Sequence, residues 1–120
     1  MTHLDVAGRP EGPPRIPGRR AVRPRDAATL IVVRRDTGKP QVLMGRRHGR
    51  HSFMPNAWVF PGGRIDRADF RAPHATELRP EVAATFNTHL TGARGRALAL
   101  AAIRETYEEA GLLLAQAAPP

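Results

Sequence analysis

The segment that most constrains the fold is residues 97–112, with the sequence ALALAAIRETYEEAGL. Apolar side chains recur in it at spacings of three and four residues, which predicts an amphipathic helix with one buried face. Ala, Leu, Arg and Glu favour a helix, and Gly111 stands where a left-handed residue commonly ends one. The predicted buried stripe consists of Leu100, Ile103 and Tyr107, extended by Ala97 and Ala110.

Three carboxylates gather near the C-terminal end of this helix. Glu105, Glu108 and Glu109 stand at positions i, i+3 and i+4, so they project over one part of the surface. Like charges at this spacing repel, and the negative end of the helix dipole disfavours them further. A divalent cation would offset both effects, because Mg²⁺ prefers clustered carboxylate oxygens. A solvated acidic helix end is the competing interpretation, and the helix alone does not separate the two.

Composition limits the class of protein. A chain of 120 residues has room for one domain, and the absence of cysteine excludes disulfides, thiolate metal ligands and a cysteine nucleophile. No apolar run approaches the roughly 18 residues of a membrane span, so we expect no membrane partner and a cytoplasmic location. The formal net charge of +8, nearly all from arginine, indicates an anionic partner. Because basic and aromatic residues are not interleaved, we expect a small anionic molecule rather than nucleic acid.

The chain is expected to begin with a tail and then to form a β-hairpin. Residues 1–26 are rich in Pro, Gly and Arg and lack an apolar period, which predicts a disordered basic tail. Residues 27–35, AATLIVVRR, predict a buried strand, and residues 41–47, QVLMGRR, predict its antiparallel partner. The turn between them is predicted at residues 36–40, DTGKP.

A cluster of basic side chains surrounds the start of a polar loop at residues 48–56. The cluster supports two interpretations, a rim that contacts phosphate and an ordinary solvated loop. Nothing in the sequence pairs its histidines with an orienting group, so we do not expect them to bind a metal. The cluster consists of Arg46, Arg47, His48, Arg50 and His51.

A short strand and a second helix are predicted between this loop and the main helix. Residues 57–60 predict an apolar strand that ends at Pro61-Gly62-Gly63, because proline cannot donate to a strand ladder. The two glycines permit the backbone to approach closely whatever lies opposite. Residues 81–90 predict a short helix with Pro80 in its first turn.

Two segments of the chain, a strand that ends in a glycine pair and the later acidic helix end, resemble the Nudix hydrolases. This family cleaves nucleoside diphosphates linked to another moiety. The first piece is WVFPGG at residues 58–63, and the second is RETYEEAGL at residues 104–112. The family pattern in the second piece reads Arg-Glu-apolar-x-Glu-Glu-x-Gly-apolar, with Thr106 here at the apolar position. The resemblance implies an α/β fold, an α/β/α sandwich with a mixed sheet, of which residues 27–120 would form the N-terminal portion.

The resemblance also assigns roles to the clustered side chains. It implies that Glu105, Glu108 and Glu109 bind Mg²⁺ or Mn²⁺ with help from a backbone carbonyl near Gly62. Arg104 would orient these carboxylates, and together with them would form the catalytic set. The implied activity is hydrolysis of the diphosphate linkage of a nucleoside diphosphate derivative, of coenzyme A or nucleotide-sugar type. The remaining charge of the diphosphate is assigned to Arg46, Arg47 and Arg50.

The sequence departs from the family pattern between the two pieces. They are separated by an insertion at about residues 66–95, and Arg96 stands where the pattern has Glu. Asp66 and Asp69 are candidates to replace that glutamate. The widened spacing is similar to a subgroup that includes coenzyme A diphosphatase-like members, although no coenzyme A signature is legible before the glycine pair.

The sequence also ends early, nine residues after Gly111. This predicts that the C-terminal part of the sheet is missing and that an edge strand is unpaired, which a homodimer would close. Two alternatives to a hydrolase therefore stay open. A non-catalytic Nudix-like module that binds a nucleotide or nucleic acid is favoured by Arg96 and the basic surface, and an inactive truncated fragment is favoured by the early end. For an intact parent protein we expect the hydrolase, and for these 120 residues alone the fragment.

Overall fold

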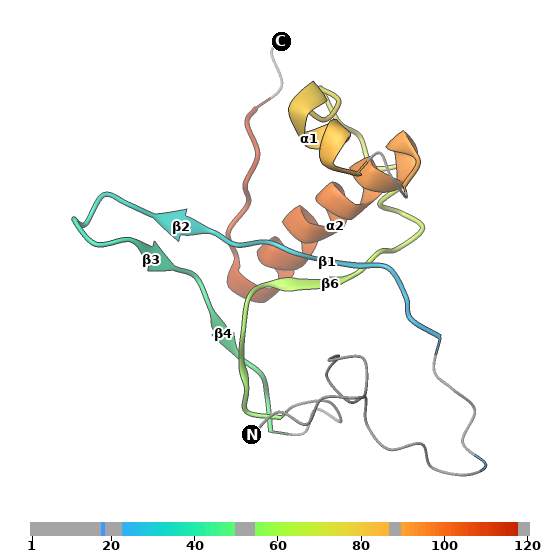
Figure 1. Ribbon diagram of the computed structural model, residues 1–120. Helices are drawn as coiled ribbons and strands as arrows, with labels where there is room; N and C mark the ends of the chain where they lie inside the picture. Colours follow the sequence, from blue (N-terminus) through green and yellow to red (C-terminus); the bar gives the residue numbers. More distant parts are fainter. Residues whose placement is uncertain (1–17, 19–22, 50–54, 87–89, 118–120) are drawn as a thin grey trace, which may run out of the picture.

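The computed structural model describes Gly18 and residues 23–49, 55–86 and 90–117. Short strands come first in this part of the chain and helices follow, which confirms the mixed α/β class (Figure 1). The strands are β1 (Ala27–Thr29), β2 (Val33–Arg34), β3 (Gln41–Val42), β4 (Gly45–Arg46), β5 (Trp58–Val59) and β6 (Gly62–Arg64). The helices are α1 (Pro80–Phe86) and α2 (Gly92–Ala110).

The described strands form three antiparallel pairs. β1 pairs with β6, β2 with β3, and β4 with β5. Further backbone hydrogen bonds extend these pairs, such as the bond from the Leu30 amide to the Pro61 carbonyl at 2.9 Å. α2 packs on β1 and β6, whereas the β2–β3 hairpin projects away from the helices (Figure 1). The β1–β6 pair is therefore the platform that positions α2.

The predicted hairpin forms, but its strands are shorter and more exposed than the sequence indicated. The single buried strand predicted over residues 27–35 is wrong, because the chain changes its pairing partner between β1 and β2. The return strand predicted over residues 41–47 is likewise divided into β3 and β4. Ile31 and Val33 are 58% and 42% exposed, since α2 packs on β1 and β6 rather than on β2.

A new strand begins directly after Pro61, where the sequence predicted that a strand would end. β5 lies within the predicted strand 57–60, and after Pro61 the two glycines enter β6. Pro61 has no amide hydrogen, but its carbonyl still accepts from Leu30. A Cβ on Gly62 would lie 2.7 Å from Cα of Thr29, well inside van der Waals contact. β1 and β6 therefore approach each other at a distance that only glycine permits.

α2 ends as predicted and begins earlier than predicted. Gly111 has φ +69° and donates its amide to the carbonyl of Tyr107 at 2.8 Å, a left-handed helix cap. At the other end, the hydroxyl of Thr91 accepts from the Arg94 amide at 3.3 Å. This cap places the first helical residue at Gly92, five positions before the predicted start. α1 includes the predicted Pro80, whereas residues 87–89 of its predicted range lie outside the described residues.

The buried face of α2 consists of small side chains. Ala97, Ala101 and Thr106 are fully buried, and Ala102 is 5% exposed. The Thr106 hydroxyl donates to the Ala102 carbonyl at 2.8 Å, so its polar group is satisfied inside the helix. Small residues on this face let the helix axis lie close to the β1–β6 pair.

The predicted stripe of large side chains on α2 is therefore partly wrong. Tyr107 is 54% exposed, because small residues of α2 rather than Tyr107 make the contact with β1 and β6. Leu100 and Ile103 are half-buried at the sides of the contact, and Ala110 is exposed.

Asp26 joins the end of the predicted tail to the domain. Its carbonyl accepts from the Ile65 amide at 3.1 Å, and its carboxylate pairs with Arg94 at the start of α2. Apart from Gly18 and residues 23–26, the predicted disordered tail lies outside the described residues. Among the helices that the structure describes, none combines the length and the apolar character needed to cross a bilayer.

Candidate active site at the C-terminal end of α2

The Glu105 carboxylate lies directly against the backbone of β6. A Cβ on Gly63 would overlap the carboxyl carbon of Glu105 and would lie 2.6 Å from its Oε2. Gly63 pairs with Ala28 of β1, so its position is fixed by the strand register. The missing side chain at Gly63 is thus what allows this carboxylate to reach the sheet.

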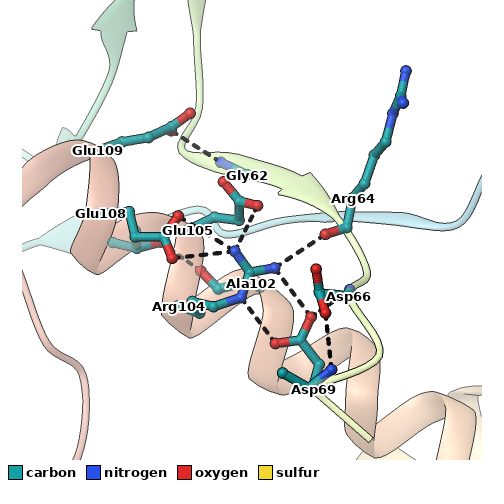
Figure 2. Close-up of polar contacts among 11 residues, drawn as sticks. Gly62, Arg64, Asp66, Asp69, Ala102, Arg104, Glu105, Glu108 and Glu109 are labelled. Carbon is teal, nitrogen blue, oxygen red and sulfur yellow. Dashed lines mark hydrogen bonds and ion pairs between the residues drawn. The ribbon is translucent and has the colours of Figure 1, made fainter.

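Glu109 reaches the same strand from the next turn of the helix. Its Oε2 accepts from the Gly62 amide at 3.3 Å (Figure 2). The resemblance implied that a backbone carbonyl near Gly62 helps to bind the metal. The structure shows a contact of the Gly62 amide, so the role of the carbonyl stays a prediction. The two glycines therefore meet two of the three predicted metal-binding glutamates, Gly63 opposite Glu105 and Gly62 opposite Glu109.

Arg104 occupies the centre of the acidic side chains (Figure 2). Its Nη1 donates to Glu105 Oε1 at 2.9 Å and to the Glu108 carboxylate at 3.4 Å. On the opposite side, Nε and Nη2 donate to the two oxygens of Asp69 at 2.9 and 3.0 Å. Nη2 also donates to the Arg64 carbonyl at 3.1 Å. The hydrogen bonds that Arg104 donates to Asp69, and the weaker effect of those that it donates to Glu105 and Glu108, raise the pKa of Arg104 above its ordinary value.

Asp69 is the buried partner in this network, with an exposed fraction of 3%. Besides Arg104, its Oδ2 accepts from the Asp66 amide at 2.7 Å. The Arg104 hydrogen bonds, which outweigh the effect of burial, hold the pKa of Asp69 below its ordinary value. Asp66 caps the same turn by accepting from the Ala68 amide at 2.9 Å. Of the two aspartates that the sequence offered as replacements for the missing glutamate, Asp69 contacts Arg104 and Asp66 supports the turn.

We expect acid to weaken the protein through Asp69. A carboxylate whose folded-state pKa is depressed stabilises the fold above the unfolded pKa of about 4, and this contribution is lost as the pH falls through the lower folded value. Urea unfolding of the wild type and Asp69→Asn at several pH values between 7 and 2 would measure it.

The gap in unfolding free energy between these two proteins should be largest above about pH 4 and should shrink toward pH 2. Asp36→Asn is the control, because the Arg34–Asp36 pair has both side chains more than 60% exposed and should give a smaller gap. A gap for Asp69→Asn that does not change with pH would contradict this assignment.

Arg96, which stands where the family pattern has Glu, contacts an acid from the insertion. Its Nη1 donates to Glu77 Oε1 at 2.5 Å, and His74 Nε2 lies 3.4 Å from the same oxygen. The Arg96 hydrogen bond lowers the pKa of Glu77. Two ion pairs thus join the insertion to α2, Glu77 with Arg96 and Asp69 with Arg104, in addition to the packing of α1 on α2.

A groove of about 440 Å³ lies beside the acidic helix end. It runs from Gly62 and Glu109 to β4 and the residues after it. Two of the three arginines predicted to bind substrate line this groove, and Arg50 lies outside the described residues, as does His51. The structure therefore brings positive side chains from the hairpin to the same opening as Glu109. The polar side chains that line the groove are Arg46, Arg47, His48 and Glu109.

The donor set at the helix end suits a hard divalent cation, since it consists of carboxylate oxygens. The three glutamates do not converge on one point in the described structure, because Glu105 and Glu108 contact Arg104 while Glu109 contacts Gly62. Rotation of their side chains is needed for them to share one cation. The three glutamates therefore suit a divalent cation by the chemistry of their oxygens and by their positions on one helix end.

The sequence analysis missed the roles of Glu77 and Thr106 and left Asp69 as one of two candidates. Arg96 was the available signal for Glu77, because a basic residue at an acidic position of the pattern calls for an acidic partner nearby. No signal distinguished Asp69 from Asp66, since the choice depends on the fold of the turn at residues 66–69.

Comparison with known proteins shows the family of this chain. The family model described as NUDIX domain matches residues 24–118 of this chain. The chain belongs to the Nudix family, and both the glycine pair and the acidic helix end lie inside the matched region.

Individual relatives give a finer comparison. The chain is 29% identical over 133 aligned positions to acyl-coenzyme A diphosphatase NUDT19 of Xenopus laevis, covering 75% of this chain and 34% of that protein. It is 35% identical over 95 positions to acyl-coenzyme A diphosphatase NUDT19 of Gallus gallus, covering 62% of this chain and 25% of that protein. The chain thus spans about a third or less of the length of these relatives.

A solved structure is also similar. The crystal structure of a NUDIX hydrolase from Alicyclobacillus acidocaldarius matches with a TM-score of 0.53 and 34% identity. The match covers 75% of this chain and 38% of the other. Both the fold and the sequence thus point to the same family.

Proposed function

We propose that this chain carries the cation-binding part of a diphosphatase that acts on an acyl-coenzyme A or a related nucleoside diphosphate derivative. The observation that carries the proposal is the seating of Glu105 against Gly63, with Glu108 and Glu109 on the same helix end and Arg46 and Arg47 across the adjoining groove. The names of the relatives support the choice of an acyl-coenzyme A.

Each element of the site has a part in this proposal. A bound Mg²⁺ or Mn²⁺ would neutralise the diphosphate and activate a water molecule for attack at phosphorus. Glu105, Glu108 and Glu109 would hold the cation, and Arg104 would set the direction of the first two carboxylates through its hydrogen bonds. Arg46 and Arg47 would pair with diphosphate oxygens that enter the groove.

The experiment compares the wild type with Glu108→Gln/Glu109→Gln. We expect Mg²⁺ or Mn²⁺ to raise the melting temperature of the wild type, because a ligand that binds the folded state stabilises it. We expect cation-dependent release of product from an acyl-coenzyme A, and loss of about a hundredfold or more in kcat for the variant. Glu81→Gln is the matched control, since Glu81 is an exposed carboxylate on α1 that should affect neither result.

Other outcomes favour other functions. Binding of a nucleotide without cation-dependent turnover would favour a non-catalytic nucleotide-binding module. The hydrogen bonds from Arg104 to Glu105 and Glu108 also suit such a module, because they satisfy these carboxylates without a metal. Absence of a cooperative unfolding transition would favour a fragment that needs more chain to fold. Steep salt dependence of RNA binding would contradict the expected preference for a small molecule. A concentration-dependent melting temperature would support the homodimer predicted from the open sheet edge.

A further inference from the structure

The Arg104 guanidinium is shared between two sets of carboxylates that have different geometry. Asp69 receives two hydrogen bonds, at 2.9 and 3.0 Å, from adjacent nitrogens of the fork. Glu105 receives one at 2.9 Å, and Glu108 is 3.4 Å away. A two-point contact fixes both the position and the plane of a guanidinium, whereas a one-point contact does not. Asp69 therefore determines where the guanidinium lies.

Asp69 is itself held firmly. Its side chain is 3% exposed, its Oδ2 accepts from the Asp66 amide at 2.7 Å, and its own amide donates to the Asp66 carbonyl at 3.2 Å. The turn is also held against α2 farther along the insertion, through the contact of Glu77 with Arg96. Asp69 is thus more deeply buried than the two glutamates that Arg104 contacts, since the side chains of Glu105 and Glu108 are 18% and 55% exposed.

Arg104 and a divalent cation would bind the same carboxylate oxygens, those of Glu105 and Glu108. A guanidinium that moved fully onto Glu105 and Glu108 would neutralise them and would have to be displaced before a cation bound. The contacts to Asp69 and to the Arg64 carbonyl engage Nε and Nη2, so that in this structure only Nη1 donates to the glutamates (Figure 2). A divalent cation therefore competes for the oxygens of Glu105 and Glu108 with a single nitrogen of Arg104, Nη1.

We propose that Asp69 is a positioning residue that engages Nε and Nη2 of Arg104, so that only Nη1 contacts Glu105 and Glu108 and their other oxygen lone pairs are available to a divalent cation. The inference rests on the proposed function and goes further, because it gives the insertion a direct role in cation affinity.

The test measures Mn²⁺ affinity by electron paramagnetic resonance of free Mn²⁺, with no substrate present. We expect Asp69→Asn to bind Mn²⁺ about 10- to 100-fold more weakly than the wild type, because the released Arg104 occupies the glutamates. We expect Asp69→Asn/Arg104→Gln to recover part of this loss, since the competing guanidinium is gone, although its hydrogen bond to Glu105 is gone as well. Asp36→Asn makes the same chemical change at an exposed ion pair and should stay within about twofold of the wild type.

Recovery in the double variant separates positioning from a purely structural role. A residue that only supported the fold would leave the double variant as weak as Asp69→Asn, and that result would overturn the inference. So would an Asp69→Asn protein that binds Mn²⁺ as tightly as the wild type, while the proposed function would stand. A wild type that binds no Mn²⁺ would overturn both.

Arg104→Lys carries the test if Asp69→Asn does not fold, as judged by its thermal transition. Lysine keeps a cation beside the buried Asp69, but one nitrogen cannot make the two-point contact. We expect Mn²⁺ affinity to fall by about tenfold because the ammonium is not held in place. Unchanged affinity in folded Arg104→Lys would overturn the inference.

Discussion

Alanine in place of Gly62 is expected to lower the free energy of unfolding by about 3 kcal/mol, one of the largest effects that a single methyl group can have in this chain. The added Cβ would overlap the Ala28 carbonyl oxygen and would lie 2.7 Å from Cα of Thr29. Both are backbone atoms of β1, so they cannot move aside without breaking the register of β1 and β6. Urea unfolding followed by fluorescence of Trp58 would measure the loss.

Gly45→Ala is the matched control for this prediction. Gly45 also lies in a strand, but a Cβ there would meet nothing within 4 Å. We expect its unfolding free energy to change by no more than about 1 kcal/mol in either direction. Equal losses for the two variants would show that alanine weakens strands generally here and that the close approach of β1 and β6 has no special importance.

Gly63→Ala is expected to damage the candidate site more than the fold. The added Cβ would overlap the end of the Glu105 side chain rather than backbone, and a side chain can rotate away. Because that rotation removes Glu105 from its place on β6, we expect Mn²⁺ affinity and any turnover to fall by about tenfold or more. The loss of unfolding free energy should be smaller than for Gly62→Ala.

A second substitution tests the cause. In a Glu105→Ala background the clash at Gly63 is absent, so Gly63→Ala should no longer change cation affinity and should change the unfolding free energy by no more than the roughly 1 kcal/mol expected for Gly45→Ala. If Gly63→Ala has the same effect in both backgrounds, Glu105 is not the group that requires glycine at this position. Titration with Mn²⁺ and urea unfolding of the four proteins would give the answer.

The helix and its acidic end were predictable because they depend on local information. Periodic apolar residues and Gly111 located the C-terminal end of α2, and turn residues located the β2–β3 hairpin. The extent of the strands was not predictable, since the sequence between β1 and β2 gives no sign of the change of partner. The buried face of α2 was misjudged at Tyr107 because the closeness of β6 selects small residues for the contact.

The site shows the same division between local and long-range information. The spacing of the three glutamates follows from the helix, and a nearby glycine pair is visible in the sequence. The contact of Asp69 with Arg104 joins residues 35 positions apart, so only the fold of the insertion could reveal it. The predictions for Arg50 and for most of the tail concern residues outside those that the structure describes, and they stay predictions.

The two ion pairs that join the insertion to α2 also have a consequence for protein engineering. Asp69 and Glu77 supply the acids, and Arg104 and Arg96 are their partners on the helix. A deletion that restored the usual family spacing would remove both acids and leave two arginines on one helix without them. The loop cannot be trimmed or grafted onto another scaffold by itself. Loop and helix form one exchangeable cassette, and a working chimera would have to carry both.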